Sequence, residues 1–137
     1  MGRILGIDYG LKRIGLALSD PLHIIASPYK TISGSDEADI LQKLRDIISE
    51  ESVSHIVVGL PIGMKGQETE QTKLTRVFAD SLNCFGLPIF LQDERLSSVS
   101  AKKSLIEQNI KTGYNKALID KRAAAILLQQ FMDINQL

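Results

Sequence analysis

The sequence has one cysteine, Cys84, no tryptophan, and only 5% aromatic residues among its 137 positions. A lone cysteine cannot form a disulfide within the chain, so we expect a reducing compartment. It also cannot build a zinc site on paired cysteines. With so few aromatic side chains, backbone recognition of nucleic acid is favoured over stacking on unpaired bases.

Long apolar runs and an excess of charge are also missing. No apolar run approaches the length of a membrane span, and the first residues lack the apolar segment and cleavage site of a signal peptide. We therefore expect a cytoplasmic protein without a membrane partner. The formal net charge is zero, so no global field indicates a polyanionic partner.

The charges are nevertheless unevenly distributed along the chain. Residues 36–51 contain six acids and two bases, whereas residues 95–122 contain seven bases and two acids. A basic segment favours phosphate binding, although solvated helix faces give the same pattern.

The chain has the length of one domain, and its 44% apolar content suits an aliphatic core. We expect one domain over residues 1–137. Periodicity and turn residues predict strands over residues 3–8, 14–19, 24–32, 55–61 and 89–92. They predict helices from an N-cap at Ser35 through residue 48, over residues 68–82, after Ser97 or Ser98, and over residues 116–133.

The order of these elements predicts the fold class. Three antiparallel strands are followed by βα units, which favours a three-layer α/β domain with a mixed five-stranded sheet flanked by helices. Pro28 indicates that the third strand is irregular or lies at an edge. Gly10 in the first turn indicates a positive φ or a close approach of the backbone.

Three acidic positions are candidates for a functional site. Asp8 ends the first strand, and Asp93 and Glu94 follow the last one, where strand alternation lets only one of the two join Asp8. Asp120 shares a helix face with small and apolar residues, so it is expected to point inward. Each position also has an ordinary explanation: an Asx turn at Asp8, a surface ion pair with Arg95, and a helix-dipole contact at Asp120.

If these three acids lie close together, they would form a site for a divalent metal ion. Carboxylate clusters select hard cations such as Mg²⁺ or Mn²⁺, and metals held in this way activate water and stabilise a phosphoryl transition state. The matching reaction is hydrolysis of a phosphodiester bond. Sequence spacing alone does not establish the convergence.

Other chemistries have less support. His23 and His55 lie in separate segments without ligand spacing, so they are expected to be structural or surface residues. Residues 10–15 imitate part of a P-loop, but Leu16 and Ala17 stand where Lys and Ser or Thr are required. The glycine-containing loop over residues 59–66 is either a plain turn or a ligand-binding loop at a strand end.

Four blocks of the sequence together resemble the YqgF/RuvX family of RNase H-like proteins, and the match covers essentially the whole chain. The blocks are Gly6-Ile7-Asp8-Tyr9-Gly10 with residues 13–20, Val57-Val58-Gly59-Leu60-Pro61, Asp93-Glu94-Arg95-Leu96-Ser97, and Ile119-Asp120 with Ala123-Ala124 and residues 126–129. The resemblance implies an RNase H-like fold. It also implies a metal-dependent nuclease, described for the family both as a Holliday junction resolvase and as a nuclease maturing the 5′ end of pre-16S ribosomal RNA.

The resemblance further implies a set of site residues. Carried over by position, the acidic site that would hold Mg²⁺ or Mn²⁺ falls on Asp8, Glu94 and Asp120. Arg13 and Arg95 would bind phosphate nearby. Lys12 and Lys121 are additional nucleic-acid-binding candidates, and the family often has Glu where this chain has Ser100. Classical resolvases also carry an acid on the strand that here reads Val57-Val58-Gly59-Leu60-Pro61, so Glu94 would substitute for it from a different strand.

Three hypotheses follow from the sequence. The leading one is a nuclease acting on an rRNA precursor or on branched DNA, as a monomer or a homodimer. An actin-like sugar kinase also uses an Asp-x-Gly hairpin, but it needs two such domains around the nucleotide. The third is a nucleic-acid-binding ribosome-maturation factor without catalysis.

Overall fold

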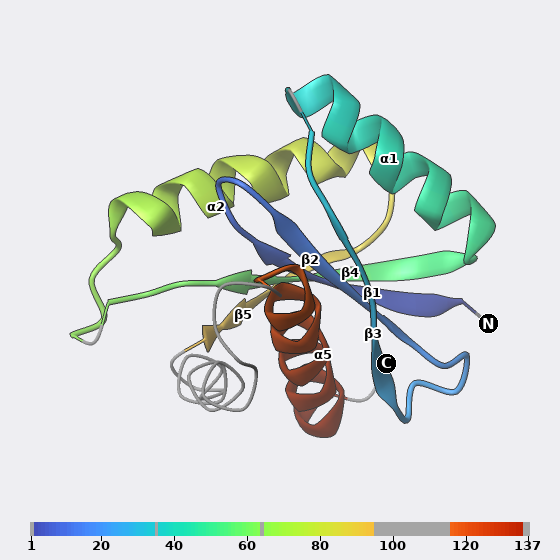
Figure 1. Ribbon diagram of the computed structural model, residues 1–137. Helices are drawn as coiled ribbons and strands as arrows, with labels where there is room; N and C mark the ends of the chain where they lie inside the picture. The colour runs from blue at the N-terminus through green and yellow to red at the C-terminus, as the bar shows by residue number, and fades with distance from the viewer. Residues whose placement is uncertain (1, 35, 64, 95–115, 136–137) are drawn as a thin grey trace.

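The computed structural model describes residues 2–34, 36–63, 65–94 and 116–135 (Figure 1). In order, its elements are β1 (Arg3–Tyr9), β2 (Ile14–Ser19), β3 (Ala26–Ile32), α1 (Glu37–Glu50), β4 (Val53–Leu60), α2 (Glu70–Ser81), the 3₁₀ helix η1 (Leu82–Phe85), β5 (Ile89–Asp93) and α5 (Lys116–Ile134). The predicted helix after Ser97 or Ser98, together with Arg95 and Ser100, lies outside the described residues.

The sheet has the order β3-β2-β1-β4-β5. The pairs β1–β2 and β2–β3 are antiparallel, and β4 is parallel to both β1 and β5. The predicted mixed sheet with an antiparallel opening is therefore confirmed. Pro28 lies in β3 at the edge of the sheet, next to a shift of register between β2 and β3, because proline cannot donate a ladder hydrogen bond.

The turn between β1 and β2 brings two backbone segments close together. A Cβ atom on Gly10 would lie 2.5 Å from the carbonyl oxygen of Arg13, closer than real Cβ atoms come. Gly10 is not among the described glycines with a positive φ. Close backbone approach, one of the two predicted reasons for a glycine, is therefore the one that applies.

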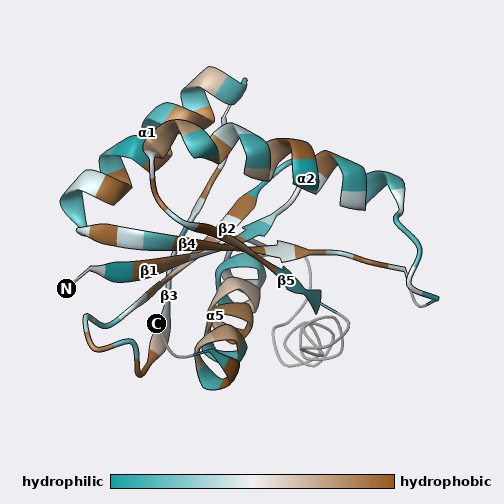
Figure 2. Cartoon of the chain, turned by 180° about the vertical axis from the view of Figure 1, so that it is seen from behind, coloured by the Kyte–Doolittle hydropathy of each residue, from teal (hydrophilic) through white to brown (hydrophobic). Residues whose placement is uncertain are grey.

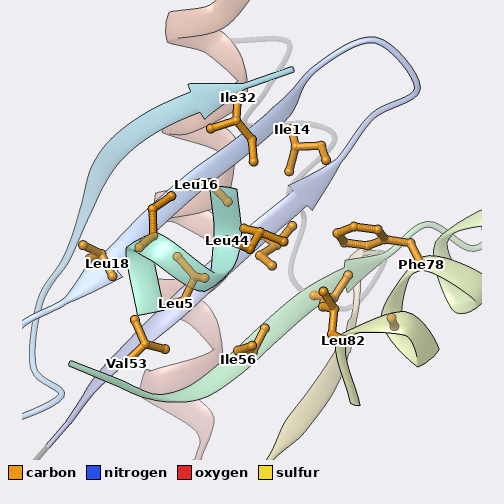
Figure 3. Packing of buried hydrophobic residues seen from close by; sticks show 14 residues of the cluster. Leu5, Ile14, Leu16, Leu18, Ile32, Leu44, Val53, Ile56, Phe78 and Leu82 are labelled. Carbon is orange, nitrogen blue, oxygen red and sulfur yellow. The ribbon is translucent and has the colours of Figure 1, made fainter. Parts of the chain in front are cut away.

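Side chains alternate along β1 between two hydrophobic clusters on opposite faces of the sheet. Leu5 and Ile7 face α1 and α2, where Leu44 and Phe78 join the larger cluster (Figure 3). Ile4 faces the opposite way and packs in the cluster that includes Ala124, Ala125, Leu128 and Phe131 of α5. The three layers seen in Figure 1 follow from this alternation, because each face of the sheet buries one set of apolar residues.

Helices α1 and α2 are amphipathic, as the banded colouring in Figure 2 shows. Helix α1 turns Leu44 and Ile47 to the sheet. Its N-cap is Asp36, whose side chain accepts a hydrogen bond from the backbone N–H of Asp39 at 2.9 Å. The predicted N-cap at Ser35 is wrong by one position, because the carboxylate of Asp36 provides both a hydrogen-bond acceptor and a negative charge at the helix N-terminus.

Helix α2 begins after a capping box in which Thr69 and Thr72 satisfy each other's backbone N–H groups. It ends at Ser81, earlier than predicted, because the chain tightens into η1 and stops at Gly86, which has a φ of 70°.

Helix α5 contacts all of β1, β2 and β3 across the second face of the sheet. Ala123, Ala124, Leu127 and Leu128 are fully buried there. No helix in the described part of the chain is long and apolar enough to cross a membrane.

Candidate active site at the carboxyl end of β1

Asp8 lies near the end of β1 on the face covered by α5. Alternate residues of a strand point to the same side, so Asp8 shares its face with Ile4 and Gly6. Ile4 packs in the α5 cluster, and a Cβ on Gly6 would lie 2.8 Å from the Cβ of Leu128 in α5. The half-buried side chain of Asp8 therefore lies on the α5 side of the sheet.

Asp8 has a glycine beside it on each neighbouring strand. Gly15 of β2 is its register partner. On the other side Ile7 pairs with Val58, so Gly59 of β4 is the next residue along the parallel strand. Strands lie about 4.8 Å apart, and residues side by side in a sheet face the same way. The two glycines therefore leave Asp8 without a side chain beside it on either neighbouring strand.

The carboxylate of Glu94 occupies the space above Gly59. A Cβ on Gly59 would lie 2.8 Å from Oε1 of Glu94 and 2.8 Å from Cδ2 of Leu127. Gln92 is the register partner of Gly59, so Glu94, two residues further, has the same phase along the chain. Glu94 rather than Asp93 is thus the acid of this segment that lies above Gly59, next to the strand that carries Asp8.

The backbone of Asp120 covers Gly15 on the other side of Asp8. A Cβ on Gly15 would overlap the carbonyl group of Asp120, so the start of the described part of α5 lies directly on β2. The side chain of Asp120 is 13% exposed, and its Oδ2 accepts a hydrogen bond from Nε of Arg13 at 2.9 Å. This ion pair joins residues 107 positions apart, and the sequence, which indicates Arg13 only as a phosphate-binding base, does not predict it.

The three acids therefore come from β1, from the end of β5 and from α5 to neighbouring positions on the α5 side of the sheet. As they stand, however, no three His, Cys, Asp or Glu side chains among the described residues form a group that could hold a metal ion. Their oxygen donors fit Mg²⁺ or Mn²⁺ chemically. A cation at this place would compete with Arg13 for the carboxylate of Asp120.

The remaining predicted binding residues are only partly placed. Lys12 is exposed in the turn between β1 and β2, and Lys121 is half-buried beside Asp120 on α5. The described part of the loop at residues 59–66 forms a turn, in which the N–H of Gly66 donates to the carbonyl of Gly63 at 2.8 Å.

The two histidines lie near the opposite end of β1 from Asp8. His55 is adjacent to Ile4 in the register, Nδ1 of His55 is 2.8 Å from the Ser54 hydroxyl, and Nε2 of His23 is 2.7 Å from the carbonyl oxygen of Gly2. Burial, and secondarily the nearby His23, lower the pKa of His55. Both rings take part in local packing and hydrogen bonding, in agreement with the structural role predicted for them.

Gly15 and Gly59 both belong to the sequence motifs, but their position beside Asp8 is given only by the register of the strands. Each stands inside an apolar strand, where glycine is unfavourable without a reason such as a close approach. A glycine within an apolar strand therefore indicates a close contact at both positions. Without the register, it does not indicate that the two glycines flank Asp8.

Comparison with solved structures identifies the structural class to which the fold belongs. The structure described as "T. thermophilus RuvC in complex with Holliday junction substrate" superimposes with a TM-score of 0.62, covering 98% of this chain and 95% of that chain at 14% sequence identity. At that identity the similarity establishes the fold, which is the RNase H-like arrangement of a mixed five-stranded sheet between helical layers.

The sequence comparisons then give the family. The model of the RuvX Holliday junction resolvase family matches residues 2–134. A protein of Roseiflexus sp. (strain RS-1) named "Putative pre-16S rRNA nuclease" is 41% identical over 133 residues, which are 96% of this chain and 94% of the relative. A protein of the same name from Dictyoglomus turgidum is 42% identical over 132 residues, with coverage of 96% and 94%. The chain belongs to the RuvX family, as its sequence motifs indicated.

Proposed function

We propose that the protein is a divalent-metal-dependent nuclease that hydrolyses phosphodiester bonds in structured nucleic acid, and that its substrate is the 5′ end of pre-16S rRNA. The observation that supports this most strongly is the approach of Glu94 and Asp120 to the glycines on either side of Asp8. The names of the relatives support pre-16S rRNA as the substrate, and the family resemblance implies its 5′ end.

Asp8, Glu94 and Asp120 would hold the cation, which is Mg²⁺ or Mn²⁺ because their donors are hard oxygens. When bound, such a cation activates water and stabilises the charge that develops at phosphorus. Asp8 sits in the rigid sheet and fixes the position of the site, while Glu94 and Asp120 close it from β5 and α5.

Arg13 has a separate role in this proposal. Its side chain is 34% exposed, and a planar guanidinium suits bidentate contact with the oxygens of a backbone phosphate. Binding of metal and substrate would draw Asp120 and Arg13 apart, each to a new partner of opposite charge. Lys12, Lys121 and Arg95 would add electrostatic contacts along the nucleic-acid backbone.

A second candidate substrate is a branched DNA, because the matching family model is that of a Holliday junction resolvase. A two-fold symmetric junction would suit a homodimer. A third possibility from the sequence, a maturation factor that binds nucleic acid without cutting it, predicts binding with no metal-dependent turnover.

The test is a cleavage assay with two labelled substrates, an RNA spanning the 5′ end of pre-16S rRNA and a four-way DNA junction. Each is incubated with Mg²⁺, with Mn²⁺, or with a chelator, and purified Asp8→Asn is the control for contaminating nucleases. We expect metal-dependent cleavage of the RNA that exceeds cleavage of the junction. Cleavage of the junction alone would assign the protein to DNA, and salt-sensitive binding without cleavage would refute the nuclease proposal.

A further inference from the structure

Two glycines border Asp8, but they contact different kinds of atoms. At Gly15 the added Cβ would meet the backbone of Asp120 and Lys121, which cannot move without shifting α5. At Gly59 the nearest atoms are instead the ends of two side chains, Oε1 of Glu94 and Cδ2 of Leu127, each at 2.8 Å. Gly59 can therefore be changed with little damage to the fold, and the group that must move is an acid of the candidate site.

We propose that Gly59 is a positioning residue: the space left by its missing side chain is where the Glu94 carboxylate lies, one strand away from Asp8. Gly59 is the register partner of Gln92 in β5, and Val58 just before it is the partner of Ile7 in β1. Its position is thus set by the sheet. A methyl group at this point would occupy the space of Oε1 and turn the carboxylate of Glu94 away from Asp8.

This inference rests on the proposed function, because it concerns how the acids are brought to one cation. Binding of Mn²⁺ to the whole protein, measured by titration calorimetry without nucleic acid, provides a readout that does not depend on turnover. We expect Gly59→Ala to weaken Mn²⁺ binding about tenfold, the range seen when groups that orient metal ligands are changed.

The matched control is Gly6→Ala, which lies on the same face of the neighbouring strand. A Cβ there would meet Cβ of Leu128 and, at 3.3 Å, the carbonyl oxygen of Ala124, so it presses on α5 without touching an acid. Gly6→Ala should lower the melting temperature, and because it displaces only α5, with Asp120, its loss of Mn²⁺ affinity should be clearly smaller than that of Gly59→Ala. Equal losses of affinity in both variants would show a general effect of α5 displacement and overturn the proposal.

A double-mutant cycle with Glu94→Gln tests the link to Glu94 directly. If Gly59 acts through Glu94, Gly59→Ala should add no further loss once Glu94→Gln has removed the charge. Independent, additive losses would overturn the positioning role. If Glu94→Gln alone leaves Mn²⁺ affinity unchanged, the assignment of Glu94 in the proposed function fails, and the positioning role fails with it.

Should Gly59→Ala fold poorly, Leu127→Ala relieves the second contact. In the Leu127→Ala background the added methyl group competes with Glu94 alone. Adding Gly59→Ala to this variant should still weaken Mn²⁺ binding about tenfold. Unchanged Mn²⁺ affinity in the Gly59→Ala/Leu127→Ala double variant would overturn the positioning role of Gly59. The proposed nuclease function would still stand if Glu94→Gln alone weakens Mn²⁺ binding.

Discussion

Arg13 and Asp120 form the ion pair that most directly links the hairpin to α5 at the candidate site. The guanidinium is part-buried and its Nε lies 2.9 Å from Oδ2 of Asp120. In the proposed reaction both groups change partners. Under the proposed function, metal and substrate would have to separate this pair in order to bind.

Replacing Arg13 should separate cleavage from metal binding. We expect Arg13→Gln to lower kcat/KM about 10- to 100-fold, because a charged hydrogen bond to phosphate contributes about 1.5–3 kcal/mol. Mn²⁺ affinity should not fall, since Arg13 competes for Asp120. Lys12→Gln, in the exposed part of the same turn, is the control and should have a much smaller effect. A clear loss of Mn²⁺ affinity in Arg13→Gln would mean that Arg13 holds Asp120 in place rather than competing for it.

His55 gives the fold a pH dependence away from the acids. Its pKa is lowered by burial and by His23, so below the ordinary histidine value near 6.5 the unfolded chain takes up a proton that the folded chain does not. Stability should therefore fall as the pH decreases through the window below about 6.5. His55→Gln should flatten this decrease when melting temperatures are measured between about pH 7 and pH 5. An unchanged slope would assign the decrease to other groups.

At the scale of elements, the packing of α5 on the sheet determines the geometry of the site. The helix reaches β2 at Gly15 and β1 at Gly6, and alanines at positions 123 and 124 are fully buried in the contact. Small residues on both surfaces let the helix axis come close to the sheet. Asp120 is brought to Asp8 by this close approach.

Gly15→Ala should be strongly destabilising, because its Cβ overlaps a backbone carbonyl that cannot rotate away. We expect a loss of about 3 kcal/mol in urea unfolding, at the upper end of the usual cost of overpacking. Gly63→Ala is a suitable comparison, since its Cβ would meet only the flexible side chain of Gln67, and it should cost less than about 1 kcal/mol. Similar losses in the two variants would contradict the backbone contact.

Most of the fold could be predicted from local pattern. The hairpin, the edge strand with Pro28, and the helices α1, α2 and α5 follow from periodicity, turn residues and caps, which are properties of neighbouring residues. The predictions that were wrong concern the ends of helices. The N-cap of α1 is Asp36 and not Ser35, and α2 ends at Ser81, where a 3₁₀ turn begins. At such ends, neighbouring residues compete to satisfy the same backbone groups.

The candidate site could be predicted only in part. Strand alternation predicts that only one of Asp93 and Glu94 joins Asp8, and the family resemblance indicates Glu94. The inward direction of Asp120 follows from the helix face. The pairing of Arg13 with Asp120, and the flanking of Asp8 by Gly15 and Gly59, depend on contacts between segments far apart in the chain. No local pattern encodes such contacts.

On the scale of the whole molecule, the sheet separates two tasks. The face under α1 and α2 carries the larger hydrophobic cluster (Figure 3). The face under α5 carries a smaller cluster and, toward the carboxyl end of β1, Asp8. Asp8 lies past the buried part of β1 and is itself half-buried. Its charge can therefore be removed without opening either cluster.

The charge of Asp8 is the feature on which the proposed activity depends most directly. Asp8→Asn keeps the shape of the side chain, so melting temperature and salt-dependent binding of the RNA should stay close to wild type. Single-turnover cleavage of the pre-16S rRNA substrate, measured at saturating Mn²⁺ and with the RNA bound, should fall at least about 1000-fold, as expected when a group needed for transition-state stabilisation is lost. Cleavage by Asp8→Asn at the wild-type rate would contradict the central claim that Asp8 is the centre of the active site.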